Sequence, residues 1–257
     1  MKSDDLTSKL VEVFMSPKYD QNSRALLYAQ GKKEGTIRDE IASVISKSSA
    51  AMTSQIEFSV DKDSISRWND KLRHLGYFDS KWGLNREKKN ARIDVVAFEN
   101  GVITQVIEVK AWSSGDAVDL TRFGSQKKHN HSISRSFEID ALKLLSIAGD
   151  RVQRTIVTAL FTIHCDGLSL SDIRQHKLAY PGLLHLQNRD KAGIGSSFDY
   201  RATAIRNMTS ELNRQFGLGT VLSSRIHHKE AFSAPDGLID GVGVSMDLFI
   251  AEIGTAQ

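Results

Sequence analysis

The sequence predicts an α/β fold, a central mixed β-sheet flanked by helices. Apolar residues recur at helical spacing in some segments, and they alternate or run continuously in others. The resulting order is helix, strand, strand, strand, helix, strand, which is typical of helices packed on a mixed sheet. With 257 residues, 40% of them hydrophobic, the chain can bury one large core. We therefore expect a single domain over residues 1–257.

The first half of this pattern begins with a helix at 35–49, whose apolar stripe is Ile37, Ile41, Val44 and Ile45. Residues 54–60 alternate between apolar and polar, which predicts a strand, and a short helix follows at 66–75. Two strands rich in β-branched residues are expected at 91–98 and 102–112. Glu99-Asn100-Gly101 lies between them and is a strong hairpin signal.

The second half predicts a helix at 134–149, with Phe137, Ala141 and Leu144 on one face, and a buried strand at 154–164. Beyond residue 165 the pattern is less regular. We expect a short strand at 183–186, an amphipathic helix at 200–217 and a final strand at 241–253. The pair His227-His228 is assigned to a surface loop.

Composition excludes several classes of protein. No stretch approaches 18 consecutive apolar residues, so we expect no membrane association. The polar start has no apolar signal region behind it, and Cys165 is the single cysteine, which excludes an internal disulfide and a Cys-rich zinc site. A cytoplasmic protein is the expectation.

Basic residues concentrate in two segments, 81–92 and 121–135, while the net charge is only +3. The second segment contains no acid and includes His129 and His131. The two segments bracket a cluster of carboxylates, and this favours a polyanionic partner such as a nucleic acid.

Two charged residues, Glu108 and Lys110, interrupt the apolar run VITQVIEVKAW. Charge in a core strand is costly unless it is paired or binds a metal. Because side chains alternate along a strand, Glu108 and Lys110 share one face. Asp94 lies on the preceding strand, and the hairpin decides whether its face coincides with that of Glu108.

Two turns suit the residues Asn100-Gly101. A two-residue type I′ turn would pair Asp94 with Ile107 and put Glu108 on the opposite face. A three-residue turn that includes Glu99 would pair Asp94 with Val106, so that Glu108 and Asp94 share a face. A joint active site needs the three-residue turn or an equivalent bulge.

The first helix offers a third acid. Glu40 lies between Ile37 and Val44 at helical spacing, and a carboxylate on an apolar stripe suggests a partner beneath it. Glu57 is the alternative, although its neighbours Gln55 and Ser59 favour a solvated position.

The chemistry that suits these residues is metal-assisted phosphodiester hydrolysis. Mg²⁺ is usually held by one or two carboxylates, waters and substrate phosphate oxygens. Asp94, Glu108 and the backbone carbonyl of Val109 could supply the protein ligands. Lys110 would reach the same place, where an ammonium can position the attacking water and stabilise phosphate charge.

Asp94, thirteen intervening residues, then Glu108-Val109-Lys110 resembles the motif of the PD-(D/E)XK nuclease superfamily. The resemblance covers about residues 35–165 and implies a restriction-endonuclease-like core. It implies an endonuclease that cleaves double-stranded DNA with Mg²⁺, which Mn²⁺ can replace. Asp94 and Glu108 would bind the metal, Lys110 would be the catalytic lysine, and Glu40 the auxiliary acid. One departure is Ile93, which stands at the position of the family's namesake proline.

Within that superfamily we expect a type II restriction endonuclease acting as a homodimer, because palindromic double-strand cleavage needs two active sites. The C-terminal third would supply recognition and dimer contacts. Candidate DNA-binding residues are the basic ones near the motif: Lys88, Lys89, Arg92, Arg122, Lys127, Lys128 and Arg135. The alternatives are a junction-resolvase-like repair nuclease and a non-catalytic DNA-binding protein of the same fold.

Overall fold

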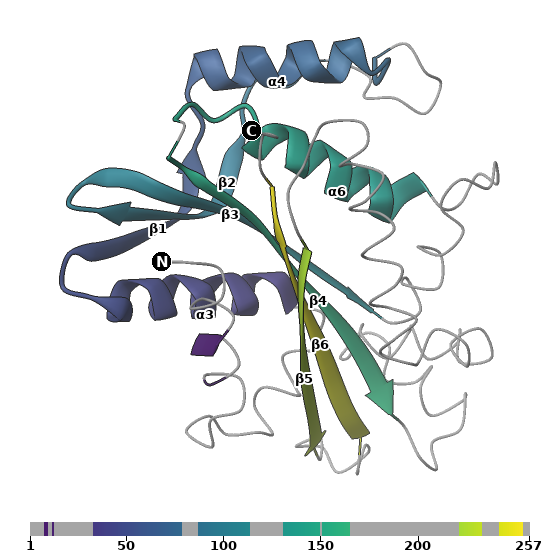
Figure 1. The fold of residues 1–257 in the computed structure, drawn as a ribbon. Coiled ribbons are helices and arrows are strands. Elements are labelled where there is room, and N and C mark those ends of the chain that lie inside the picture. Colours follow the sequence, from purple (N-terminus) through teal and green to yellow (C-terminus); the bar gives the residue numbers. More distant parts are fainter. Residues whose placement is uncertain are drawn as a thin grey trace.

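The computed structural model of the chain contains one six-stranded sheet with helices on both sides (Figure 1). The strand order is β1-β2-β3-β4-β6-β5. Helix α3 lies on one side of the sheet, and α4 and α6 lie on the other. The predicted α/β class with a mixed sheet is confirmed. The structure describes these parts of the chain: residues 8, 9, 12, 33–78, 87–113, 131–149, 151–164, 221–232 and 242–253.

The first three elements are α3 (Lys33–Ser48), β1 (Met52–Ser59) and α4 (Lys62–His74). Helix α4 begins four residues before its predicted start. Its N-cap is Asp61, whose carboxylate accepts hydrogen bonds from the Ser64 amide at 2.8 Å and the Ser64 hydroxyl at 2.6 Å. Capping satisfies amide groups of the first turn, which otherwise have no partner inside the helix.

The next four elements are β2 (Arg92–Glu99), β3 (Val102–Ser113), α6 (His131–Leu144) and β4 (Gln153–His164). Strands β3 and β4 are parallel, and α6 forms part of the connection between them. Helix α6 ends five residues before its predicted end. At this end the Arg154 guanidinium donates to the carbonyls of Leu144 at 3.0 Å and Ile147 at 2.7 Å, and so satisfies groups that have no partner inside the helix.

The β2–β3 hairpin has a two-residue turn, so the three-residue alternative is wrong. Glu99 pairs with Val102, and both Asn100 (φ 51°) and Gly101 (φ 78°) have the positive φ of a type I′ turn. A bulge follows, because Phe98 pairs with Ile103 while Ala97 pairs with Gln105. Thr104 is the extra residue. The bulge changes the register by one residue for the rest of the hairpin.

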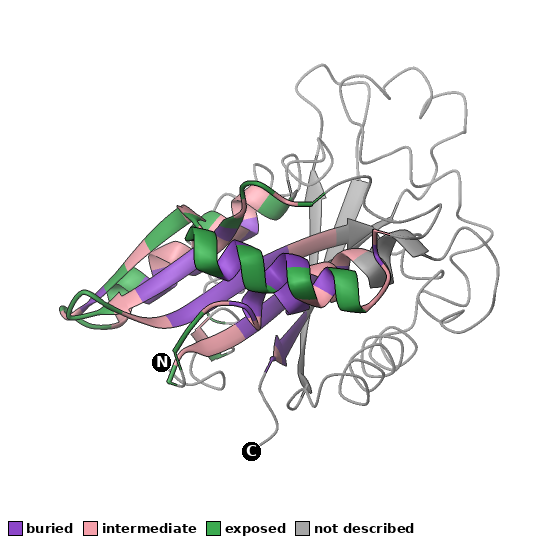
Figure 2. Ribbon diagram, turned by 90° about the horizontal axis from the view of Figure 1, so that it is seen from above, coloured by how far each residue is buried: buried purple, intermediate pink, exposed green. Residues whose placement is uncertain are grey.

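The core lies on both faces of the central strands (Figure 2). On one face, Phe137, Ala141 and Leu144 of α6 pack against Val106 and Ile156 of the sheet. On α3, the residues Ile37, Ile41 and Ile45 are fully buried. A second cluster joins α4 to α6 through Trp68, Leu72, Tyr77 and Leu142. This cluster fixes the two helices relative to each other.

The C-terminal part adds β5 (Val221–Phe232) and β6 (Val242–Glu252). Strand β6 agrees with the predicted strand at 241–253, whereas β5 was not predicted. His227 and His228 belong to β5, so their assignment to a surface loop is wrong. The predicted elements at 183–186 and 200–217 lie outside the described residues. Among the described helices, none combines the length and apolar character needed to cross a bilayer.

Candidate active site

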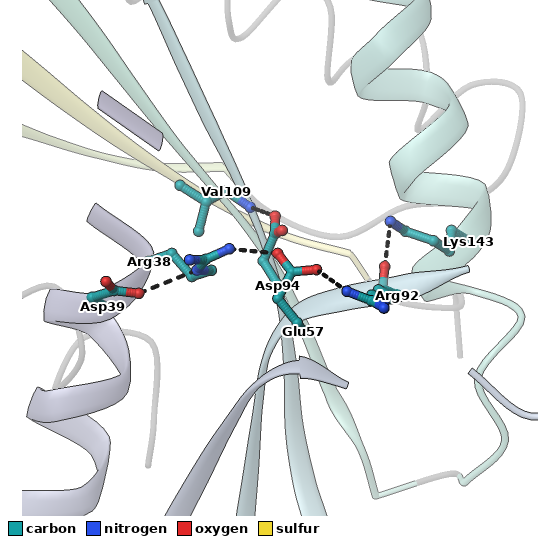
Figure 3. A network of polar contacts seen from close by, with 7 residues as sticks. All are labelled: Arg38, Asp39, Glu57, Arg92, Asp94, Val109 and Lys143. Carbon is teal, nitrogen blue, oxygen red and sulfur yellow. Dashed lines mark hydrogen bonds and ion pairs between the residues drawn. The ribbon is translucent and has the colours of Figure 1, made fainter. Parts of the chain in front are cut away.

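Asp94 lies where β2 and β3 separate. Their ladder ends at the pair Val95–Ile107, and continuing the register by one residue places Asp94 opposite Glu108. The Val109 amide, instead of entering the ladder with β2, donates a 2.7 Å hydrogen bond to Asp94 Oδ2 (Figure 3). Opposite residues of an antiparallel pair lie on the same face. The Thr104 bulge therefore meets the condition for a joint site.

Glu108 is a buried carboxylate, only 2% exposed. Its Oε1 lies 2.7 Å from Lys143 Nζ, at ion-pair distance but without the alignment of a good hydrogen bond. Burial raises the pKa of Glu108 well above its usual value. Lys143 opposes this effect, while the charges of Asp140 and Asp94 add to it.

Lys110 extends from β3 two residues beyond Glu108. Its Nζ forms a 2.6 Å ion pair with Asp140 Oδ2, and both side chains are largely buried. Burial acts to lower the pKa of Lys110, but the Asp140 carboxylate, followed by Glu34 and Glu108, raises it above its ordinary value. Lys110 is therefore charged across the physiological pH range.

Helix α6 supplies the partners of both motif residues. Asp140 pairs with Lys110, and Lys143, one turn further on, pairs with Glu108. Lys143 Nζ also lies 3.4 Å from Asp140 Oδ1 and donates a 2.9 Å hydrogen bond to the Arg92 carbonyl. Burial lowers the pKa of Lys143, yet the surrounding carboxylates, Glu108 foremost, raise it overall.

Sequence reasoning missed Asp140 and Lys143, although a signal for Asp140 was present. Asp140 lies between Phe137 and Leu144 at helical spacing, so it borders the apolar stripe of α6 as Glu40 borders that of α3. The same argument that selected Glu40 would have selected Asp140. Lys143 has no comparable signal, since a lysine near the end of a helix is ordinary on a solvated face.

Glu34 of α3 interacts electrostatically with Lys110, Asp94 and Asp140 of the site. It is located in the first turn of α3, one turn before the buried Ile37. The residue as a whole is exposed, but partial desolvation of its carboxyl raises its pKa, Lys110 lowers it, and Asp94 and Asp140 raise it further. Glu40 is half-buried on the same helix. Its role as auxiliary acid stays a prediction.

Glu57 is held between two arginines beside Asp94 (Figure 3). The flanking pairs Ile56–Val95 and Phe58–Ile93 put Glu57 opposite Asp94 on the neighbouring strand. Its carboxylate accepts from Arg38 of α3 and, at 3.3 Å, from Arg92. Its φ of 53° is uncommon for a residue other than glycine, and such strain clusters at functional sites.

The site contains more negative than positive side chains. It gathers four carboxylates around two ammonium groups: Glu34, Asp94, Glu108 and Asp140 around Lys110 and Lys143. With Glu57, Arg38 and Arg92 included and all groups ionised, five carboxylates face four cationic side chains, so the site keeps a net negative charge that a divalent cation would complement. The raised pKa of Glu108 reflects its burial first, and then the charges of Asp140 and Asp94.

Asp94 and Glu108 are the side chains that could hold such a cation. Within the described parts of the chain, no three or more His, Cys, Asp or Glu side chains are grouped as metal ligands. A hard cation such as Mg²⁺ needs only one or two carboxylates, because waters and phosphate oxygens complete its shell. The two opposed carboxylates suit that donor set. The Val109 carbonyl as a ligand stays a prediction.

The predicted DNA-binding residues fall into three groups. Lys89 and Arg92 are exposed, and Lys88 is half-buried with its ammonium 6.0 Å from the Trp68 ring centre. Arg135 belongs to α6, but its side chain is not among those described. Arg122, Lys127 and Lys128 lie outside the described residues. Among the side chains of this set that the structure describes, Arg92 contacts the site, through Glu57 and through its carbonyl.

In comparisons with protein-family models, curated proteins and solved structures, the chain has no significant match.

Proposed function

We propose that the protein is a Mg²⁺-dependent endonuclease that hydrolyses phosphodiester bonds of double-stranded DNA. The observation that supports this best is the Thr104 bulge, which puts Asp94 opposite Glu108. The bulge thereby assembles the acid pair with Lys110 at the point where the β2–β3 ladder ends. An acid pair and a lysine are the groups that metal-assisted phosphodiester hydrolysis uses.

Asp94 and Glu108 would hold the Mg²⁺, which supplies Lewis-acid stabilisation of phosphate charge and acidifies a bound water. The remaining roles belong to side chains of the chain itself. Lys110, kept protonated by Asp140, presents an ammonium that can bind a phosphate oxygen and orient the attacking water. Asp94 is oriented by the Val109 amide, which fixes one of its oxygens.

Substrate binding is assigned to arginines at the rim of the site. Arg92, 67% exposed at its side chain, and Arg38 are both oriented by Glu57. A guanidinium held in this way can contact a phosphate with little further ordering, and phosphate contacts of this kind are independent of DNA sequence.

The finer assignment is a restriction-endonuclease-like core and a type II restriction endonuclease acting as a homodimer. The core assignment draws on the order α3, β1, β2, β3, α6, β4, with α4 as an insertion and only β3 and β4 parallel. It also draws on the motif resemblance in β2 and β3. Strands β5 and β6 extend the sheet beyond this core and are candidates for recognition or dimer contacts.

The test is cleavage of plasmid DNA by the purified protein with Mg²⁺, with Mn²⁺ and with EDTA. We expect cleavage with either metal and none with EDTA. Discrete fragments would support a restriction endonuclease, whereas selective cutting of branched DNA would support a resolvase-like nuclease. DNA binding without cleavage under both metals would refute the enzymatic function.

The site is tested separately with Asp94→Asn. This variant should cut at least about 100-fold more slowly, because it weakens the metal site while keeping the acceptor for the Val109 amide. Asp70→Asn is the matched control, since Asp70 is exposed on α4 and pairs only with Arg73 in the described structure. Full activity of Asp94→Asn would show that the acids have been assigned wrongly, even if the protein cleaves DNA.

A further inference from the structure

We propose that Lys143 is a resident counter-ion of the site. Its ammonium forms an ion pair with the Glu108 carboxylate until a divalent cation displaces it. This inference rests on the proposed metal site and adds a residue of α6 that the motif does not contain. The metal affinity of the free protein would then be set by competition with a side chain of the protein itself.

The ammonium is held by one hydrogen bond and two ion pairs. Lys143 Nζ lies 2.7 Å from Glu108 Oε1, 2.9 Å from the Arg92 carbonyl oxygen and 3.4 Å from Asp140 Oδ1. All three partners are oxygen atoms, which suit a positively charged ammonium. The side chain is 10% exposed, so this pairing is little screened by solvent.

The partners of Lys143 come from three elements that converge at the end of the β2–β3 ladder. Glu108 is on β3, Arg92 is on β2, and Asp140 is on α6 itself. The fold therefore provides this position, because a lysine elsewhere on α6 would not reach all three. The ring of Trp68, its centre 5.9 Å from Nζ, covers the same ammonium.

The Lys143 ammonium, while it is paired with Glu108, competes with a metal ion for two reasons. Oε1 pairs with the ammonium and is therefore not free to bind a metal ion. The ammonium and the metal are also both positive, so their repulsion in a poorly screened site weakens metal binding further.

Asp140 offers the displaced ammonium a second partner. Its Oδ1 lies 3.4 Å from Lys143 Nζ, while its Oδ2 holds Lys110 at 2.6 Å. A small movement of Lys143 toward Asp140 would release Glu108 without leaving the lysine unpaired. Asp140 thus couples the two lysines, and it acts as a positioning residue for Lys110.

The experiment measures Mn²⁺ binding calorimetrically in the absence of DNA, so that its readout is independent of cleavage. Lys143→Met removes the ammonium and should bind Mn²⁺ about tenfold or more tightly than the natural protein. Lys143→Arg keeps the charge and should bind like the natural protein. Lys47→Met is the matched control, because Lys47 is exposed in the last turn of α3 and forms no ion pair in the described structure.

Equal or weaker Mn²⁺ binding by Lys143→Met would overturn the inference and leave the proposed metal site intact. If that variant is folded but too marginally stable for calorimetry, thermal melts replace the titration. The increase in Tm on adding Mn²⁺ should then be larger than for the natural protein, and an equal or smaller increase overturns the inference. Glu108→Gln separates the two proposals. If it binds Mn²⁺ as the natural protein does, the metal site itself is wrong and both proposals fail.

Discussion

Glu108→Gln should stabilise the metal-free protein while abolishing cleavage. The carboxylate is buried, and its surroundings raise its pKa well above the usual value, so they favour the neutral form. Glutamine has nearly the shape of that neutral form without the charge. A tenfold change in a protonation equilibrium corresponds to about 1.4 kcal/mol. We therefore expect the unfolding free energy of Glu108→Gln to exceed that of the natural protein at pH 7.5.

The pH dependence follows from the direction of the same pKa shift. Because the folded protein holds the Glu108 proton more tightly than the unfolded chain does, the resulting stability is fully present below the unfolded pKa of 4.5. It is lost as the pH rises through the folded pKa. The stability difference between the variant and the natural protein should therefore be small at pH 4 and grow toward neutral pH.

The assay is urea unfolding followed by circular dichroism, in EDTA, at pH 4 and pH 7.5. Glu99→Gln, at an exposed position of the same hairpin, should change the unfolding free energy by less than about 0.5 kcal/mol. A Glu108→Gln protein that is less stable at pH 7.5 would refute the reasoning. It would mean that attraction to Lys143 outweighs the cost of burying the charge.

Three further outcomes test other parts of the structure. Lys110→Met should lower the cleavage rate on the order of 100-fold or more, with Mn²⁺ affinity retained, and unchanged cleavage would contradict the role of this lysine. Deleting Thr104 should remove the bulge without changing the pairing of Ala97 with Gln105, because Thr104 is the extra residue between two paired positions. Asp94 then stays opposite Glu108, and cleavage should persist. Loss of cleavage by a folded deletion variant would show that the bulge itself is needed. Phe137→Ala, at a fully buried position of α6, should lower the free energy of unfolding in urea by about 3–5 kcal/mol. The control Val102→Ala, at a position 66% exposed, should lower it by less than about 0.5 kcal/mol. A loss below 1 kcal/mol for Phe137→Ala would mean that α6 is not packed as described.

The elements around the site could be predicted from the sequence because their signals are local. Ile37, Ile41 and Ile45 mark α3 by their spacing, and the β-branched runs on either side of Asn100-Gly101 mark the hairpin. Strand β5 lacks such a signal. Its sequence VLSSRIHHKEAF does not alternate cleanly, and it is a strand because β6 pairs with it at both ends, on either side of an irregularity between Ser224 and His228.

The hairpin register illustrates a choice that local sequence left open. Asn100-Gly101 suits more than one turn, and each turn by itself implies a different partner for Asp94. The structure combines a two-residue turn with an extra residue at Thr104, which gives a third register in which Asp94 faces Glu108. Burial is the physical reason. This register puts Val96 opposite Val106, and both are buried in the core against α6.

The sequence by itself determined the α/β class and the acids and lysine of the motif, since both follow from residue types at short spacings. Only the tertiary structure decided which residues complete the site. Glu34, Asp140 and Lys143 lie far from Glu108 along the chain, and they reach its surroundings because α3 and α6 pack against the sheet where β2 and β3 separate. Their charges influence Glu108 and Lys110 strongly because the site is buried, and burial is a property of the packed fold.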